Sequence, residues 1–215
     1  MQAFRSLLRP DEKTGAAMRW AHRLWVFLWL TVFGLGIGLL SLYLAAYSCP
    51  GIDAQALWAS YFKLPLLVVM NLLLPLLVVY LGFFLFARPW AAYLLSAVPF
   101  LGLALASYYK IQLRGDPVLA SDLRLIRTAG GIMGNYTFEL TEPVKLVIAG
   151  FAGMLALSLV LLRRERMSQR GRLAGLMVML ALTLASYFEF YTSADIYEKT
   201  ANSGLINPWS ETEIY

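Results

Sequence analysis

Five long apolar runs, separated by polar segments, divide the chain at about residues 24–47, 62–86, 90–109, 144–162 and 173–191. A helix needs about 20 apolar residues to cross the hydrocarbon core of a bilayer, and each run is close to that length. The first run is also longer than the core of a cleaved signal peptide, which is usually about 7–15 residues. The pattern therefore predicts an all-α membrane protein, a bundle of five transmembrane helices.

The longest polar interval, Tyr108–Pro143, carries a pattern of its own. Asp116 before Pro117 is a favourable helix start, because a carboxylate caps free N–H groups and proline suits the first helical position. Ser121–Asp122 offers a second start one turn later. Apolar residues then recur at helical spacing, and two arginines lie off their stripe: Leu119, Leu123, Ile126 and Met133, with Arg124 and Arg127. We expect the segment 110–143 to contain an amphipathic helix that lies flat at the membrane interface, between helices 3 and 4.

The composition excludes an ordinary soluble domain. Hydrophobic residues make up 60% of the chain and charged residues 14%, against about 45–50% and 25% in soluble proteins. The single cysteine, Cys49, excludes an internal disulfide, and one cysteine with one histidine argues against a metal site of either type. We expect His22 to be an exposed residue beside the membrane.

The basic residues predict the topology. The N-terminal tail 1–23, the turn at Arg88 and the loop Arg163–Arg172 together hold eleven of the eighteen Lys and Arg residues. Because short cytoplasmic loops carry an excess of Lys and Arg, we expect the N-terminus in the cytoplasm. With five spans the tail 192–215 is then an extracellular linker, and Ser48–Tyr61 is a short outer loop.

Polar or small residues inside the spans leave alternatives open. Gly34 and Gly38 have the GxxxG spacing that lets helices approach closely; packing within the bundle is favoured over a dimer contact. Asn71, near Pro75, is expected to form an interhelical hydrogen bond rather than to line a substrate path. Glu189 is expected to reach the outer water layer or to pair with an arginine, although a carboxylate at this depth is also a functional candidate.

We find no sequence motif for catalysis or cofactor binding in the chain, and we expect it to contain no catalytic residue, no metal site and no cofactor. One charged group is a binding candidate. It consists of four cations with two interleaved carboxylates: Lys110, Arg114, Asp116, Asp122, Arg124 and Arg127. Guanidinium groups bind phosphate bidentately, so the group could hold an anionic lipid headgroup or a phosphoglycerol polymer. Alternatively, these charges pair with one another and with bulk lipid, or the segment docks an external domain.

Three stretches carry a resemblance to a known family: YYKIQLRGDPVLASDLRLIR, GNYTFELT and GLINPWSETEIY. With the five spans, they resemble the membrane domain of the bacterial lipoteichoic acid synthases. RGDP followed by SDL, at Arg114–Leu123, is the most specific part. The resemblance implies an extracellular, sulfatase-type and alkaline-phosphatase-like domain after the membrane part. In the family that domain carries a divalent metal such as manganese and a threonine nucleophile, and it transfers phosphoglycerol from phosphatidylglycerol.

The leading hypothesis follows from this resemblance. We expect an anchoring and lipid-presenting membrane domain in a bacterial cell membrane, without the catalytic domain in this chain, which ends at Tyr215 about where that domain would begin. A fragment, a split-gene product and a free-standing relative remain open. The expected partners are phosphatidylglycerol-like lipids and a catalytic domain or homologous chain, not nucleic acid. The alternatives are a stand-alone membrane protein that binds anionic lipid or a partner, and a transporter subunit with Asn71, Pro75 and Glu189 along a path.

Overall fold

The computed structural model describes residues 16–48, 51, 53–118, 122, 139–162 and 168–192, and these residues form helices and connections without strands. The helices are α2 (Ala16–Ser48), α3 (Ala54–Tyr61), α4 (Pro65–Phe86), α5 (Pro89–Arg114), α7 (Glu142–Leu161) and α8 (Gln169–Ser186), and α8 continues into a π-helical turn, η3 (Tyr187–Tyr191). Five of them are long and apolar enough to cross a membrane: α2, α4, α5, α7, and α8 with its π-helical extension. The predicted all-α class with five spans is confirmed.

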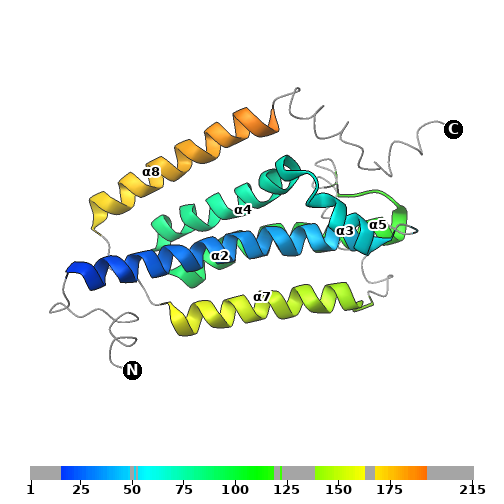
Figure 1. The fold of residues 1–215 in the computed structure, drawn as a ribbon, viewed down its shortest axis with the longest axis horizontal. Helices are drawn as coiled ribbons and strands as arrows, with labels where there is room; N and C mark the ends of the chain where they lie inside the picture. Colours follow the sequence, from blue (N-terminus) through cyan, green and yellow to red (C-terminus); the bar gives the residue numbers. More distant parts are fainter. Residues whose placement is uncertain are drawn as a thin grey trace.

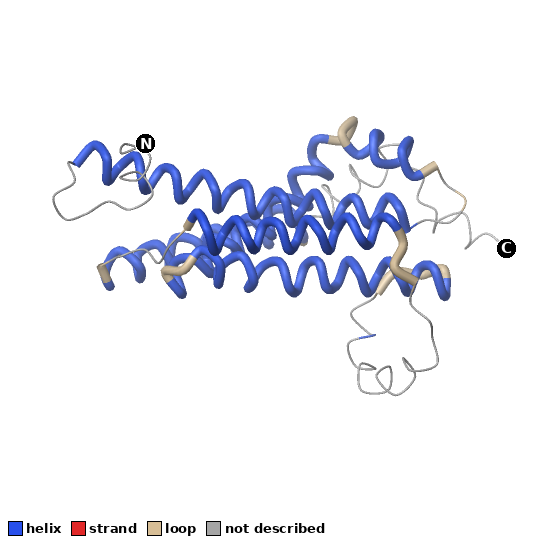
Figure 2. Tube along the Cα trace, turned by 90° about the horizontal axis from the view of Figure 1, so that it is seen from below, coloured by secondary structure: helices blue, strands red, loops and turns tan. Residues whose placement is uncertain are grey.

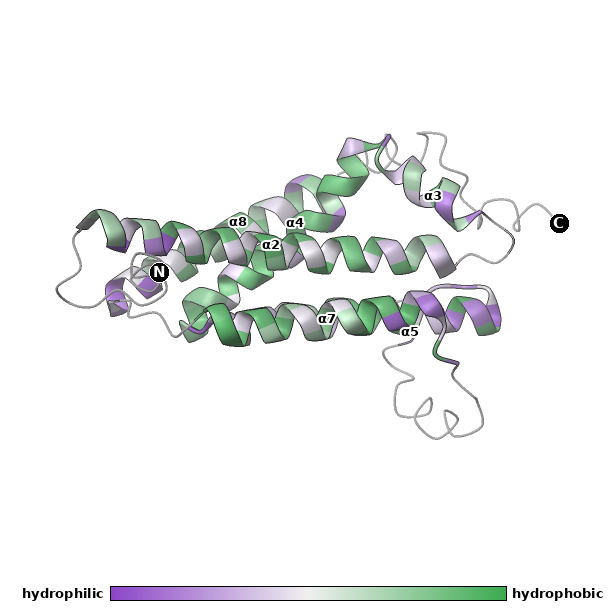
Figure 3. Ribbon diagram, turned by 60° about the horizontal axis from the view of Figure 1, so that its bottom comes forward, coloured by the Kyte–Doolittle hydropathy of each residue, from purple (hydrophilic) through white to green (hydrophobic). Residues whose placement is uncertain are grey.

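Helices α2, α4 and α5 pack against one another in the middle of the bundle (Figure 1). Helix α7 lies against α5 and α2, whereas α8 contacts α4 on the other side. Most of the buried core lies on the central helices, including Leu30, Phe33 and Tyr93, and Val144 and Val147 of α7 complete it. Many large hydrophobic residues of the spans are exposed, no residue of α8 is buried, and the spans have mostly hydrophobic colours in Figure 3. Such surfaces suit acyl chains, which are as apolar as leucine.

The spans alternate in direction, so the described segments meet at two ends (Figures 1 and 2). The basic end holds the start of α2, the turn between α4 and α5, and the start of α8. The anchor end holds α3, the end of α5 and the start of α7. Ala87 makes the tight turn at the basic end in a left-handed conformation, φ 51°, and its N–H bonds the Phe83 carbonyl at 2.7 Å. Five spans therefore alternate as the sequence predicts.

Some boundaries differ from the sequence prediction. Residues 54–61 form helix α3 rather than a loop, because Asp53 caps it: its Oδ1 accepts from the Gln55 N–H at 2.9 Å. The Trp58 ring packs edge-on against Tyr43, with ring centroids 5.7 Å apart, so α3 rests on α2. Helix α8 starts at Gln169, which places the last two arginines of the expected loop on a helix.

The glycine spacing in α2 serves packing within the bundle. A Cβ on Gly34 would lie 2.6 Å from the Leu76 Cα, and one on Gly38 would lie 2.6 Å from Leu72 Cδ2. Both neighbours belong to α4, so the favoured interpretation of the GxxxG pair is confirmed.

Two polar residues differ from expectation. Asn71 is exposed, and its amide donates to the Leu67 carbonyl of its own helix at 2.8 Å. The expected interhelical bond at this kink comes instead from Ser96, whose buried hydroxyl donates to the Pro75 carbonyl at 3.0 Å. His22 is also not exposed, since only 9% of its surface is accessible. It lies on the inward side of α2, which begins before the first apolar run and buries His22 at the basic end.

Candidate functional site

The last turns of α5 hold both ends of the polar segment that follows. We call Ser107–Gln112 the anchor turn. The Tyr108 hydroxyl shares a 2.8 Å hydrogen bond with the Thr141 hydroxyl, and the Tyr109 hydroxyl donates to the Glu139 carbonyl at 3.0 Å. Ser107 Oγ accepts from the Val118 N–H at 3.3 Å. The chain thus leaves α5 and returns to α7 beside the same helical turns.

Lys110 is the centre of the charged group. Its Nζ donates to Asp116 Oδ2, to the Pro117 carbonyl at 2.8 Å and to Asp122 Oδ2 at 2.9 Å. An ammonium group has three donors and no acceptor, so all three donors have partners. The Lys110 side chain is only 17% exposed. Lys110 therefore fixes the start of the segment, and a phosphate could bind it only by displacing one of these three partners.

Gly115 makes this arrangement possible. It ends α5 in the left-handed conformation, φ 82°, and its N–H bonds the Ile111 carbonyl at 2.9 Å. Glycine adopts this conformation without the steric cost that a Cβ brings. The chain reverses there and carries Asp116 back toward Lys110, six residues earlier.

The predicted helix start at Asp116–Pro117 is wrong. Residues 115–118 are not helical, and the Asp116 carboxylate is engaged by Lys110 instead of capping a helix. The ion pair with Lys110 joins two full charges. A cap hydrogen bond would join the carboxylate only to an uncharged backbone N–H. Of the second start only Asp122 is described. The expected interfacial helix, from Leu119 to Met133, lies outside the described residues.

The structure brings together three of the six candidate residues. Lys110, Asp116 and Asp122 form one ion-paired group. Arg114 is exposed in the last turn of α5, where a cation is favoured by the helix dipole, and no ion pair to it occurs among the described residues. Two cations and two carboxylates leave this described part formally neutral. Arg124 and Arg127 lie outside the described residues.

Several residues of the site could not be read from the sequence. Gln112 donates to the Ser48 carbonyl at the end of α2, 3.2 Å away, and Thr141 pairs with Tyr108 across 33 residues. The tyrosines and the lysine are recognisable as membrane-interface anchors. Their partners lie far away in the sequence and carry no motif.

Among the described residues, the polar side chains of the transporter alternative do not line a common path. Asn71 and Glu189 are both exposed on the bundle surface, on the separate helical elements α4 and η3. Within the same residues no group of three potential His, Cys, Asp or Glu metal ligands lies together.

Comparison with known proteins gives no relative: no family model, no curated protein and no solved structure matches the chain. The resemblance to the lipoteichoic acid synthases therefore stays a prediction from the sequence.

Proposed function

We propose that this chain is the membrane-anchoring domain of a phosphoglycerol transferase of the lipoteichoic acid synthase type, and that it presents an anionic phospholipid to the catalytic domain. The observation that carries the proposal is the division of charge at the anchor end. Lys110 is committed to Asp116 and Asp122, whereas the guanidinium of Arg114, four residues later on α5, is exposed and without an ion-pair partner among the described residues.

In this proposal the two kinds of cation have different tasks. Lys110 positions the segment that begins at Gly115, and the phosphate is held by guanidinium groups. Arg114 supplies one of them at the end of a rigid helix, and Arg124 and Arg127 follow in the same polar segment. Arginine suits this task because its planar fork of donors matches a phosphate, while a lysine acts as a point charge.

The reaction itself is assigned to an external catalytic domain or a homologous chain. Such a domain would bring the divalent metal and the nucleophile, and this chain would bring the lipid headgroup within its reach. The N-terminus is proposed to lie in the cytoplasm and the anchor end on the extracellular side of a bacterial cell membrane, in agreement with the basic residues of the opposite end.

The test compares two exposed arginines at opposite ends of the bundle. Arg114→Gln and the matched control Arg19→Gln, at an exposed position in the first turn of α2, are purified in detergent and titrated with vesicles of phosphatidylglycerol or phosphatidylcholine. We expect Arg114→Gln to weaken phosphatidylglycerol binding about tenfold, as for the loss of one charge-assisted bidentate contact. Phosphatidylcholine binding should not change. Equal effects of both substitutions would contradict the proposal.

A second candidate function is favoured by the formal neutrality of the described charged group. In it, the anchor end is an interface anchor of a stand-alone membrane protein that binds a partner protein. Unchanged phosphatidylglycerol binding by Arg114→Gln, combined with an unrelated sequence downstream of the gene segment, would support this candidate. An open frame that encodes a sulfatase-like domain would support the first one.

A further inference from the structure

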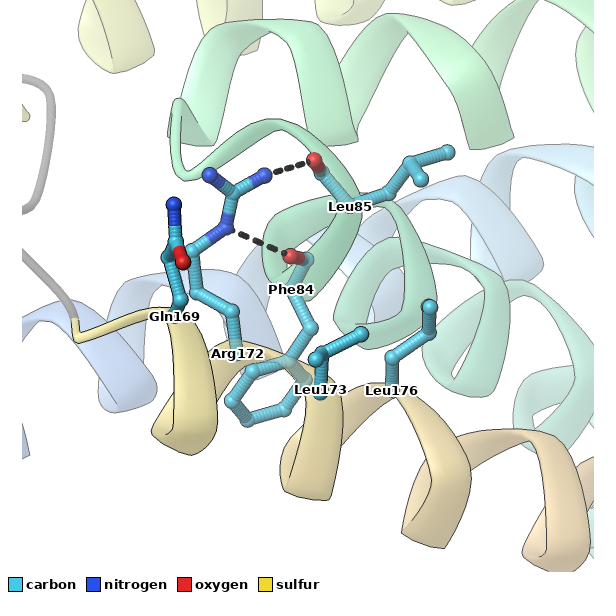
Figure 4. Close-up of a pocket in the computed structure, with 6 residues that line it drawn as sticks. All are labelled: Phe84, Leu85, Gln169, Arg172, Leu173 and Leu176. Carbon is cyan, nitrogen blue, oxygen red and sulfur yellow. Dashed lines mark hydrogen bonds between the residues drawn. The ribbon is translucent and has the colours of Figure 1, made fainter.

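A pocket lies at the basic end, away from the charged group described above. It has a volume of about 280 Å³ and lies between the end of α4 and the first turns of α8 (Figure 4). Four apolar and two polar residues line it: Phe84, Leu85, Leu173 and Leu176, with Gln169 and Arg172. Ligand pockets usually measure about 300–1,000 Å³, so this one has room for part of a ligand rather than for a whole large molecule.

Arg172 is held in place by the end of α4. Its Nε donates to the Phe84 carbonyl at 3.2 Å, and its Nη2 donates to the Leu85 carbonyl. The last carbonyls of a helix have no partner within the helix, so these bonds satisfy acceptors that the turn at Ala87 leaves open. A guanidinium has five N–H donors. Among the described residues two of them have partners, and the other three are then available to a ligand without any need to reorient the group.

The contact between the two helices is close at this point. A Cβ on Gly175 would lie 2.3 Å from the Phe84 ring, so the absence of a side chain lets that ring lie against α8. The ring forms one wall of the pocket below the guanidinium (Figure 4). The polar and apolar parts of the pocket are thus adjacent and fixed by the same helix pair.

The two described segments that form the pocket carry charge of one sign. Segments 84–90 and 168–176 contain Arg88, Arg170 and Arg172 and no carboxylate. In the charged group of the anchor end, in contrast, Asp116 and Asp122 balance Lys110 and Arg114. The pocket also adjoins the start of α8, where the helix dipole is positive. The basic end therefore favours an anion. The charged group described at the anchor end has no net charge and so attracts an anion less strongly.

We propose that this pocket binds an anionic phospholipid in the leaflet at the basic end. The phosphate is held by the remaining donors of Arg172 and by the Gln169 amide, and the first part of an acyl chain lies against Leu173 and Leu176. The apolar surface continues along α8 to Met177 and Leu180, which are 64% and 44% exposed. That continuation leads into the hydrocarbon region and distinguishes a lipid from free phosphate. Basic pockets between membrane helices bind lipid headgroups in this way.

The test counts lipids bound to the detergent-purified chain by native mass spectrometry, with dioctanoyl phosphatidylglycerol as the probe and the phosphatidylcholine of equal chain length as the comparison. All variants are made in an Arg114→Gln background, which removes the contact proposed for the anchor end. We expect Arg172→Gln to weaken phosphatidylglycerol binding about tenfold, and the matched control Arg170→Gln to change it less than twofold. Equal losses for both arginines would mean that surface charge alone attracts the lipid, which would overturn the proposal.

A second pair of variants guards against misfolding, because Arg172 also stabilises the end of α4. Leu176→Trp fills the pocket and leaves Arg172 in place, whereas Val160→Trp introduces the same side chain at a position that is 77% exposed on α7, on the other side of the bundle. The first should abolish binding at an unchanged melting temperature, and the second should not. Binding by Leu176→Trp equal to that of the parent would overturn the proposal. Displacement of the lipid by an equal concentration of glycerol 3-phosphate would do so as well, because it would show a free-phosphate site.

Discussion

The ammonium group of Lys110 lies between two carboxylates, and this position determines which cations at the anchor end remain available to a phosphate. Its three donors serve Asp116, Asp122 and the Pro117 carbonyl. A ligand phosphate would have to replace one of these partners in a group that is already neutral. Arg114 has no ion-pair partner among the described residues. We therefore assign a positioning role to Lys110 and a binding role to Arg114.

Replacing Lys110 with methionine tests this assignment. The substitution leaves two carboxylates without their counter-ion, and we expect a loss of unfolding free energy of about 1 kcal/mol, because partly exposed ion pairs contribute no more than that. Limited proteolysis should cut the segment after Gly115 faster, and thermal unfolding in detergent should begin earlier. Arg114→Met is the control, and it should change both measurements less than Lys110→Met does, because it breaks no ion pair among the described residues.

The outcome that contradicts the assignment is specific. If Lys110→Met leaves proteolysis and unfolding as in the parent but weakens phosphatidylglycerol binding as much as Arg114→Gln does, Lys110 contacts the lipid. A double-mutant cycle with Asp116→Asn measures the pair itself, because residues in contact show a coupling energy that distant residues lack.

At the scale of elements, close approach of α2 to α4 depends on a missing side chain. A Cβ on Gly34 would lie 2.6 Å from the Leu76 Cα, and a backbone atom cannot move aside as a flexible side chain can. We expect Gly34→Ala to destabilise the bundle by about 1–3 kcal/mol, the usual cost of overpacking. Thermal unfolding in detergent measures it.

Gly102 in α5 is the matched control for this prediction. Nothing lies within 4 Å of a Cβ added there, so Gly102→Ala should leave stability unchanged or raise it by up to about 1 kcal/mol through helix propensity. Equal losses for both alanines would mean that helix flexibility, not packing against α4, explains the glycine at position 34.

The spans could be predicted from the sequence because a helix that crosses a bilayer needs an apolar run of a certain length, and such a run is visible in the sequence itself. The extensions could not. Helix α5 runs on to Arg114 because its last turns are stabilised by polar partners such as Thr141 and Ser48, which lie in other parts of the chain. The anchor turn thus depends on tertiary contacts. The charged residues of the sequence showed roughly where it lies, but not which residues it contacts.

At the scale of the whole molecule, the two ends of the bundle differ chemically. The basic end contains the start of α2 together with Arg88 of the α4–α5 turn and Arg170 and Arg172 of the first turn of α8. At the anchor end, Lys110 and Lys145 are both paired with carboxylates. If the excess of arginine fixes the orientation, the lipid proposed for the pocket belongs to the inner leaflet and the lipid proposed for Arg114 to the outer one. The two proposals then concern different pools of lipid.

Cysteine labelling in intact cells tests this orientation. After replacement of Cys49 by serine, single cysteines are placed at Ser168, before α8 at the basic end, at Gln55, exposed on α3 at the anchor end, and at Asn202 in the tail. A membrane-impermeant maleimide should label positions 55 and 202 in intact cells and position 168 only after permeabilisation. Because the described spans alternate, positions 55 and 168 must give opposite results in either orientation. Labelling of position 168 alone in intact cells would show the opposite orientation. The arginine-rich end would then be extracellular, and Arg114 would lie in the cytoplasm, where an extracellular transferase could not use it.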